Sequence, residues 1–224
     1  MLKALIFDVD GTLAETEELH RKAFNKVFVE YGLNWLWDQP LYGELLKIAG
    51  GQNRLRFYIQ KYQPDGAADL LDQVADMHRQ KTTIYGQLLA DGKMDLRPGI
   101  EKLINEAIEK QLKLAIVTST SRVNVDRLFK ATIGLDVLAR FEAICCGDDV
   151  NEVKPSPEIY LLALKNLDLS GDECLAFEDS EIGLTSALAA NIPTIITVST
   201  YCKDDDFSGA RMIMSDLLSG NFKL

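Results

Sequence analysis

Two carboxylates follow the first apolar segment of the chain, and a single valine separates them. Residues 4–7 are apolar and lead directly into Asp8 and Asp10, after which Gly11 and Thr12 begin a turn. Two acids this close repel each other, and placing them at the end of a buried strand is unfavourable unless a cation lies beside them. The pair therefore indicates a chemical or metal-binding role more than a plain turn.

Polar side chains follow three later apolar segments in the same way. They are Thr118, Ser119 and Thr120 after segment 112–118, Asp148, Asp149 and Lys154 after segment 141–146, and Glu178, Asp179 and Ser180 after segment 173–178. Taken singly, such acids and hydroxyls often begin turns or cap helices, and a loop lysine is often solvated. In an open parallel sheet, however, the carboxyl ends of the strands meet at one edge, where ligands bind. We therefore expect these side chains to converge on one site.

The chemistry that this set predicts is phosphoryl transfer. One carboxylate, Asp8, can attack phosphorus and form an aspartyl-phosphate. The second, Asp10, can protonate the leaving alkoxide and then deprotonate the attacking water. On this hypothesis, the first strand is a rigid mount for the nucleophile and for the acid/base.

The remaining polar residues suit the charges of such a reaction. The carboxylates of Asp8 and Asp179, with Glu178 near them, are hard oxygen ligands that suit Mg²⁺. Thr118 and the backbone N–H of Ser119 can hold the equatorial oxygens of a phosphoryl group. The cationic Lys154 offsets charge that develops in the transition state.

Strands and helices alternate in the second half of the chain. Apolar segments 112–118, 141–146, 173–178 and 194–198 predict strands, and helical spacing of apolar residues predicts helices that begin near 98–100 and span about 122–133, 156–167 and 181–190. This alternation is typical of parallel strands with right-handed crossovers. Together with the first strand, it predicts an α/β fold with a Rossmann-like parallel sheet.

Residues 15–94 differ, because they show long helical patterns and no convincing strand. We interpret this stretch as a helical cap domain inserted after the first strand. The predicted catalytic core is then residues 1–14 and 95–224. Trp35 and Trp37 are expected to pack inside the cap.

Composition limits the partners of the chain. The formal net charge of −10 argues against nucleic acid and anionic membranes as partners. No apolar run reaches the roughly 18 residues that span a bilayer, and the short first run ends at an acid, unlike a signal peptide. The four cysteines (Cys145, Cys146, Cys174 and Cys202) form no C-x-x-C pair, and we expect them to be reduced core residues. A cytoplasmic protein is the default expectation, although an organellar segment removed from this chain is compatible with it.

The four strand-end motifs resemble those of the haloacid dehalogenase superfamily. These are DVDGT at 8–12, Thr118-Ser119, Lys154-Pro155 and Glu178-Asp179, and the inserted helical cap fits the same pattern. The second acid, Asp10, resembles the phosphatase and phosphomutase branch and not the dehalogenases. The stretches AETEELHRKAFN, HRQKT, RPGI, KPSPEIY and FEDS further resemble the CbbY-type phosphatases.

That resemblance implies a substrate and a set of residues. The substrate would be xylulose-1,5-bisphosphate, an inhibitory misfire product of rubisco, and the cofactor would be Mg²⁺ held by Asp8, the Asp10 carbonyl and Asp179. The cap residues that would contact the sugar phosphate are Glu17, His20, Gly50, Gly51, Arg54, His78 and Lys81. The chain departs from the pattern at Gln52, where a lysine usually follows the glycine pair. This departure bears on the identity of the substrate more than on the chemistry.

Other functions remain open on the sequence. A β-phosphoglucomutase-like phosphomutase has the same motifs and type of cap, with a sugar hydroxyl as acceptor in place of water. A phosphatase for another small phosphorylated sugar is a further alternative, and a non-catalytic regulatory module on this fold is a third. The stretches ETEELHR and KPSPEIY favour the sugar bisphosphate phosphatase. A monomer is expected, because it suits a mobile cap.

Overall fold

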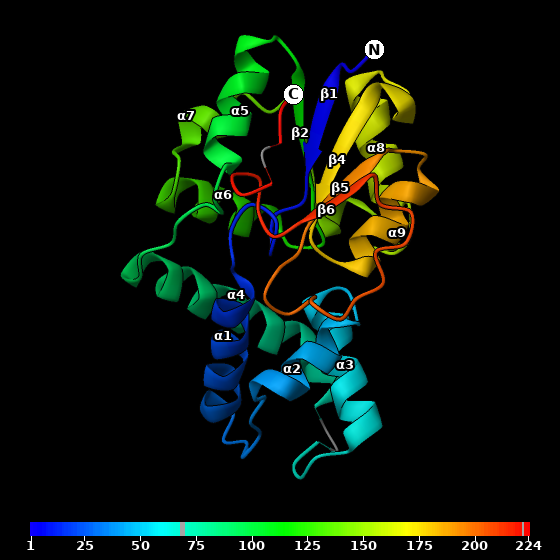
Figure 1. Ribbon diagram of the computed structural model, residues 1–224. Helices are drawn as coiled ribbons and strands as arrows, with labels where there is room; N and C mark the ends of the chain where they lie inside the picture. Colours follow the sequence, from blue (N-terminus) through cyan, green and yellow to red (C-terminus); the bar gives the residue numbers. More distant parts are fainter. Residues whose placement is uncertain (68–69, 221) are drawn as a thin grey trace. The chain divides into compact units, whose positions relative to one another are not determined.

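A six-stranded parallel sheet forms the centre of the larger part of the molecule (Figure 1). The computed structural model describes residues 1–67, 70–220 and 222–224. Within them, the strands are β1 (Ala4–Phe7), β2 (Lys113–Val117), β3 (Ala143–Cys145), β4 (Cys174–Glu178), β5 (Thr194–Thr197) and β6 (Met212–Met214). Their order in the sheet is β3-β2-β1-β4-β5-β6. The first strand is therefore central, with β2 on one side and β4 on the other.

Helices flank the sheet on both faces. They are α5 (Ile100–Glu109), α6 (Arg122–Ala131), α7 (Leu135–Leu138), α8 (Glu158–Leu167) and α9 (Glu181–Ala189), with 3₁₀ turns η2 (Gly147–Asp149) and η3 (Gly171–Glu173). In Figure 1, α5 to α7 lie on one side of the sheet and α8 and α9 on the other. This three-layer arrangement confirms the predicted α/β fold class.

The alternation of side chains along the central strand explains why both faces are covered. Ala4 and Ile6 belong to the apolar cluster that α8 and α9 complete, whereas Phe7 points to the other face. There its ring stacks on Phe177 at 5.0 Å between centroids and meets Phe141 edge-on at 6.3 Å. A strand that is apolar on both faces must be buried on both, which is the pattern of a parallel sheet under two helical layers.

The chain divides into two compact units. The sheet unit comprises Met1–Glu15 and Met94–Leu224, and the helical unit comprises Thr16–Lys93. The helical unit contains α1 (Glu17–Glu30), α2 (Gln39–Leu46), α3 (Gly51–Tyr62), η1 (Leu71–Gln73) and α4 (Val74–Asp91), and its described residues form no strand. None of the described helices is long and apolar enough to cross a membrane.

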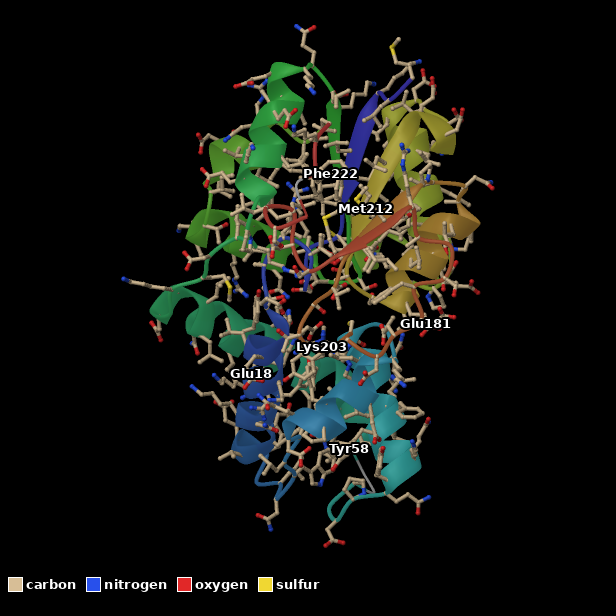
Figure 2. The ribbon with its side chains drawn as sticks, in the orientation of Figure 1. Glu18, Tyr58, Glu181, Lys203, Met212 and Phe222 are labelled. Carbon is tan, nitrogen blue, oxygen red and sulfur yellow. The ribbon has the colours of Figure 1, made fainter. Side chains whose placement is uncertain are left out.

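An aromatic cluster forms the core of the helical unit. The ring of Trp37 lies 4.7 Å from that of Phe24 and 5.0 Å from that of Phe28 between centroids. Tyr58, labelled in Figure 2, meets Trp35 edge-on at 5.4 Å and Trp37 at 5.3 Å. Each such pair adds about 0.5–1.5 kcal/mol beyond its buried area. The two tryptophans therefore pack inside this unit, as the sequence predicted.

The sheet has one strand more than the sequence predicted. Strand β6 is only three residues long and forms the edge of the sheet, where Met212 and Ile213 are 44% and 54% exposed. A segment this short and this exposed carries no periodic pattern. The four-residue helix α7 was missed for the same reason, because it is hardly longer than one turn.

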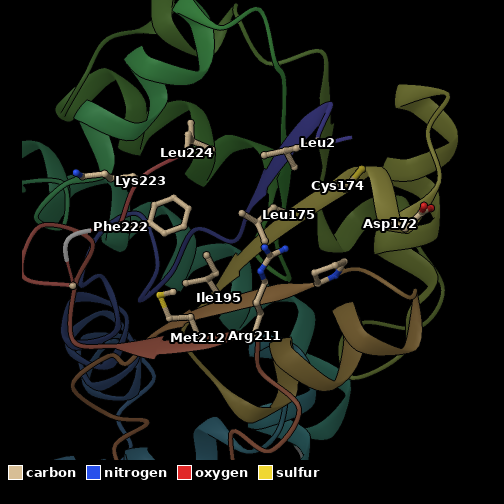
Figure 3. A pocket seen from close by; sticks show the side chains of 12 residues that line it. Leu2, Asp172, Cys174, Leu175, Ile195, Arg211, Met212, Phe222, Lys223 and Leu224 are labelled. Carbon is tan, nitrogen blue, oxygen red and sulfur yellow. The ribbon is translucent and has the colours of Figure 1, made fainter.

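A cavity of about 430 Å³ lies at the amino ends of the strands (Figure 3). Apolar side chains that include Leu175, Ile195 and Phe222 line it, together with Arg211 and Lys223. This end of the sheet is opposite to the end where Asp8 and the other strand-end residues lie. The cavity is therefore distinct from the site that the sequence predicts.

Candidate active site

The turn after β1 presents the first two acids. The backbone N–H of Asp8 donates to the carbonyl of Phe177 at 3.0 Å, so this residue still belongs to the sheet. Gly11 adopts a φ of 86°, which favours glycine, and a Cβ there would overlap the carboxylate of Asp179. A glycine at this position therefore allows Asp179, the acid that follows β4 (Cys174–Glu178), to approach the turn that carries Asp10.

Lys154 joins the ends of three strands. Its Nζ donates to Asp8 Oδ1 at 2.7 Å, to Glu178 Oε1 at 2.6 Å and to the carbonyl of Val117 at 2.9 Å. The lysine side chain is only 4% exposed, so these contacts are shielded from water. Charge-assisted bonds of this length are stronger than neutral ones. Lys154, which the sequence predicts to lie in a loop, is thus held in contact with Asp8, the candidate nucleophile.

Electrostatics in this cluster are dominated by burial and by its acids. Burial raises the pKa of Asp8 well above its usual range, and the negative charges of Glu178 and Asp179 raise it further against the opposing effect of Lys154. Burial alone would lower the pKa of Lys154, but Asp8 and Glu178 outweigh it and hold that pKa above its ordinary value. The lysine is therefore a permanent cation at this edge.

Two further contacts fix Glu178. The hydroxyl of Tyr160 donates to Oε1 at 2.5 Å, the same oxygen that accepts from Lys154. The rest of the carboxylate lies against Gly183, where a Cβ would overlap it. The sequence placed Glu178 among the metal ligands, and the structure shows that one of its oxygens is already occupied by two donors.

The loop after β2 carries the hydroxyls. Thr118 is 1% exposed, and its Oγ1 accepts from the backbone N–H of Thr120 at 3.1 Å. Its own N–H donates to the carbonyl of Cys145 at 3.0 Å. Ser119 follows, with its carbonyl packed so closely against Gly147 that a Cβ there would meet it. The loop is thus held at the same strand edge as Asp8.

Three carboxylates lie close enough to bind one cation. Oxygens of Asp8, Glu178 and Asp179 all lie within 4.8 Å of one another, and all three residues are buried. Asp179 Oδ2 also accepts from the thiol of Cys202 at 3.6 Å. Three buried carboxylates beside a single lysine leave an excess of negative charge, and oxygen donors are what Mg²⁺ prefers. This donor set fits a divalent cation.

The helical unit brings the predicted cap residues into two small networks. In the first, the hydroxyl of Tyr42 donates to Glu17 Oε2 at 2.7 Å and accepts from Arg54 Nη1 at 3.1 Å. Arg54 Nε also donates to the carbonyl of Leu45 at 3.0 Å, and its N–H to that of Gly50 at 3.0 Å. Gly50 precedes α3 with a φ of 82°, so it begins that helix rather than ending α2. The structure thus joins Glu17 and Arg54 through a tyrosine.

The second network joins α1 to α4. Lys81 Nζ lies 2.6 Å from His20 Nδ1, and the His20 ring stacks on Tyr85 with centroids 4.0 Å apart. His78 lies against α3, because a Cβ at Gly51 would overlap its imidazole. Burial lowers the pKa of His78 to about 3, with smaller contributions from Lys81, His20 and Arg54. The helical unit therefore holds a neutral imidazole among buried cations.

Comparison with known proteins assigns the family. Residues 5–197 match the haloacid dehalogenase-like hydrolase family. The chain is 45% identical over 218 residues to the plasmid CbbY protein of Cupriavidus necator, covering 96% of this chain and 86% of that protein. This chain is a haloacid dehalogenase-like hydrolase. It belongs to the CbbY-type phosphatases, because the CbbY protein of Rhodobacter capsulatus is also 46% identical over 96% of the chain and 94% of the relative.

Solved structures agree with this assignment of the hydrolase. CbbY from Rhodobacter sphaeroides in complex with phosphate superposes with a TM-score of 0.93 at 42% identity, covering 97% of this chain and 96% of that one. A mutant of the same protein, in complex with xylulose-(1,5)bisphosphate, has the same TM-score and identity. A β-phosphoglucomutase from Clostridium difficile shares the fold with a TM-score of 0.81 at 20% identity.

Two residues whose hydroxyls bond to candidate site acids were not predicted from the sequence. Tyr160 lies within the quoted stretch KPSPEIY, and its helical spacing from Ala163 and Leu164 marks it only as a core residue. Tyr42 carries no signal beyond an aromatic residue in a helical segment. Each has a fully buried ring and a hydroxyl that bonds to an acid, which only the structure shows.

Proposed function

We propose that this hydrolase removes a phosphate from xylulose-1,5-bisphosphate, giving xylulose 5-phosphate, with Mg²⁺ as cofactor. The observation that carries the proposal is the buried contact of Lys154 Nζ with Asp8 Oδ1 at 2.7 Å, beside Glu178 and Asp179. It supplies a nucleophile, a fixed cation and oxygen ligands at one sheet edge. The choice of substrate is supported by the similarity to the CbbY protein whose complex holds that bisphosphate.

The chemical steps follow from the roles of two acids. An Asp8 carboxylate oxygen attacks phosphorus, and the bond from phosphorus to the ester oxygen breaks. Asp10, protonated at that moment, gives its proton to the leaving alkoxide. Asp10 then takes a proton from water, whose oxygen attacks the aspartyl-phosphate and releases inorganic phosphate and a free Asp8.

The other residues of the sheet edge bind charge. Thr118 and the Ser119 N–H hold equatorial phosphoryl oxygens, and Lys154 offsets their developing charge. Mg²⁺, held by Asp8, the Asp10 carbonyl and Asp179, would neutralise phosphate charge when bound. Glu178 completes the acidic set, and its oxygen that is not bonded to Lys154 and Tyr160 remains available for that role.

The helical unit supplies the residues that recognise the rest of the substrate. Arg54 provides a guanidinium suited to bidentate contact with a phosphate, and Lys81 provides a second cation. Hydrogen-bond partners for the sugar hydroxyls are offered by Glu17, His20 and His78. The start of α3 is formed by Gly50 and Gly51, which have no side chain between the backbone and a substrate. We assign substrate choice to these residues because the sheet-edge residues are suited to phosphate and metal alone.

The test is phosphate release from xylulose-1,5-bisphosphate with Mg²⁺, with Asp8→Asn as the blank. Ribulose-1,5-bisphosphate, phosphoglycolate and β-glucose-1-phosphate are assayed in parallel. Rapid release from the first compound alone is the expected result. Equal or faster turnover of another ester would remove the substrate assignment, and interconversion of hexose phosphates without phosphate release would favour a mutase.

A further inference from the structure

Arg97 binds four carbonyl groups with one side chain. Its Nη1 donates to the carbonyl of Gly11 and, at 2.6 Å, to that of Thr197. Its Nη2 donates to the carbonyls of Val198 at 2.8 Å and Ser215 at 2.6 Å. Only 8% of the residue is exposed. The guanidinium therefore joins the turn after β1, the end of β5 and the segment after β6.

The same residue contacts both connections to the helical unit. The chain leaves the sheet unit after Glu15 and returns at Met94. The Arg97 backbone N–H donates to the carbonyl of Leu13 at 2.7 Å, and Nε lies 3.5 Å from Glu15 Oε1. The other oxygen of Glu15 accepts from the N–H of Thr200 at 3.4 Å. The outgoing and returning chains are thus attached to each other through Arg97.

The Gly11 contact connects this junction to the catalytic turn. Gly11 follows Asp10 directly, and its N–H donates to the carbonyl of Ala14 at 2.8 Å. Within the turn, the peptide between Gly11 and Thr12 is held by a long bond of 3.3 Å from the Thr12 N–H to the carbonyl of Val9, and Arg97 binds the other side of the same peptide through the Gly11 carbonyl. A guanidinium is planar and holds its five N–H groups in fixed directions, so its position defines the positions of the carbonyls that it binds.

We propose that Arg97 is a positioning residue that ties the turn carrying Asp10 to both connections of the helical unit. This inference rests on the proposed acid/base role of Asp10. The arginine touches no reacting atom; it holds the Gly11 peptide, and thereby the adjacent acid, in register with the end of β5 and with the two connecting segments. The stretch RPGI thus acquires a function that the motif alone did not suggest.

The experiment replaces Arg97 with lysine, which keeps the charge and loses the fixed fork. One ammonium cannot reach carbonyls spread over three segments, so we expect kcat to fall about tenfold or more with KM within about twofold. Backbone hydrogen exchange should accelerate in residues 8–16 and 92–97 and stay unchanged in β2. Arg140→Lys, at an exposed position, is the matched control and should leave all three measurements unchanged.

Two results would overturn the proposal. One is wild-type kcat and wild-type exchange in residues 8–16 for a folded Arg97→Lys variant that merely melts at a lower temperature. The other is hydrogen exchange that accelerates equally in β2 and in residues 8–16. That result would mean that Arg97 stabilises the whole sheet unit and does not specifically position the turn that carries Asp10. Activity is measured on xylulose-1,5-bisphosphate and on p-nitrophenyl phosphate. If the wild type does not hydrolyse the bisphosphate, the proposed substrate is wrong, but the effect of Arg97→Lys on kcat is still measured with p-nitrophenyl phosphate.

Glu15→Gln is the second variant, and it tests the linkage between the two connections even if Arg97→Lys does not fold. It removes the charge that faces Nε and leaves the four carbonyl contacts intact, and Glu15 is 40% exposed. We expect exchange about twofold faster or more in both residues 8–16 and residues 92–97. Unchanged exchange in either segment would refute the linkage between the two connections.

Discussion

Tyr160 and Lys154 donate to the same oxygen of Glu178, at 2.5 Å and 2.6 Å. The lysine also lies over the tyrosine ring, 5.4 Å from its centroid. A carboxylate oxygen that accepts two short bonds is held in one orientation, and it fixes both donors in return. Tyr160, a core residue of the sheet unit, therefore acts on the nucleophile candidate Asp8 indirectly. It fixes Glu178, which binds Lys154, and Lys154 binds Asp8.

Replacing Tyr160 with phenylalanine should test this arrangement. The ring and its packing remain, and only the bond to Glu178 is lost. We expect the free energy of unfolding to fall by about 1.5–3 kcal/mol, because the acceptor is charged and buried. Lys154 is then held less firmly, and kcat should fall several-fold with little change in KM. Urea unfolding and steady-state kinetics measure the two effects.

The control for Tyr160→Phe is Tyr62→Phe. That hydroxyl bonds to Glu44 Oε2 at 3.3 Å on the surface, so its loss should change stability by less than about 0.5 kcal/mol. Equal losses in the two variants would show that the buried bond has no special weight.

Replacing Gly183 with alanine should displace Glu178. Alanine normally stabilises a helix by about 1 kcal/mol relative to glycine, but here the added Cβ overlaps the carboxylate. Overpacking of this kind costs about 1–3 kcal/mol, so we expect a net loss of stability and a lower kcat. The loss of stability should shrink in a Glu178→Asp background, where the acid is one methylene shorter. Additive losses in a double-mutant cycle would argue against the overlap.

His78 should make the protein less stable in mild acid. Its folded-state pKa of about 3 lies below the ordinary value of 6.5. The neutral imidazole therefore contributes stability that is fully present above pH 6.5. It is lost as the pH falls toward 3, because the unfolded chain takes up a proton that the folded chain does not. The loss has an upper limit of about 1.4 kcal/mol per pH unit.

The comparison variant is His78→Asn. Wild type and variant should differ by a constant amount between pH 7.5 and 8.5, where the imidazole is neutral in both states. Below pH 6.5 the variant should lose stability less steeply, as urea unfolding at pH 7, 6 and 5 would show. Parallel curves over that interval would mean that His78 is protonated as easily when folded as when unfolded.

Mg²⁺ should raise the melting temperature of the wild type. A ligand that binds only the folded state stabilises it by about 2.7 kcal/mol at one hundred times its Kd. Asp179→Asn, which removes one of the three clustered carboxylates, should abolish most of this shift. Sodium chloride at equal ionic strength is the control for screening. A shift of the same size with sodium, or in the variant, would place the bound ion elsewhere.

The sequence predicted the alternating strands and helices of the parallel sheet, because their apolar residues recur at regular spacing. Strand β4 ends at Glu178 as predicted, and the acid that follows it meets Asp8 because parallel strands share one edge. The edge strand β6 was missed because it is too short for a periodic signal. No local pattern could predict the bonds from the hydroxyl of Tyr160 to Glu178 and from that of Tyr42 to Glu17. Each bond joins residues that are far apart in the sequence and meet only in the folded chain.

The order of strands has a consequence for synthesis of the chain. Strand β1 is the first to be made, but its neighbour β4 pairs Cys174 with Ala4 across most of the sequence. A nascent or truncated chain that ends between Val117 and Cys174 therefore has one unpaired edge on the strand that leads to Asp8, and unpaired edges recruit other chains. Because Glu178 and Asp179 arrive on β4, closing that edge and assembling the acidic cluster are one event. An incomplete chain thus lacks both the completed sheet and its clustered acids.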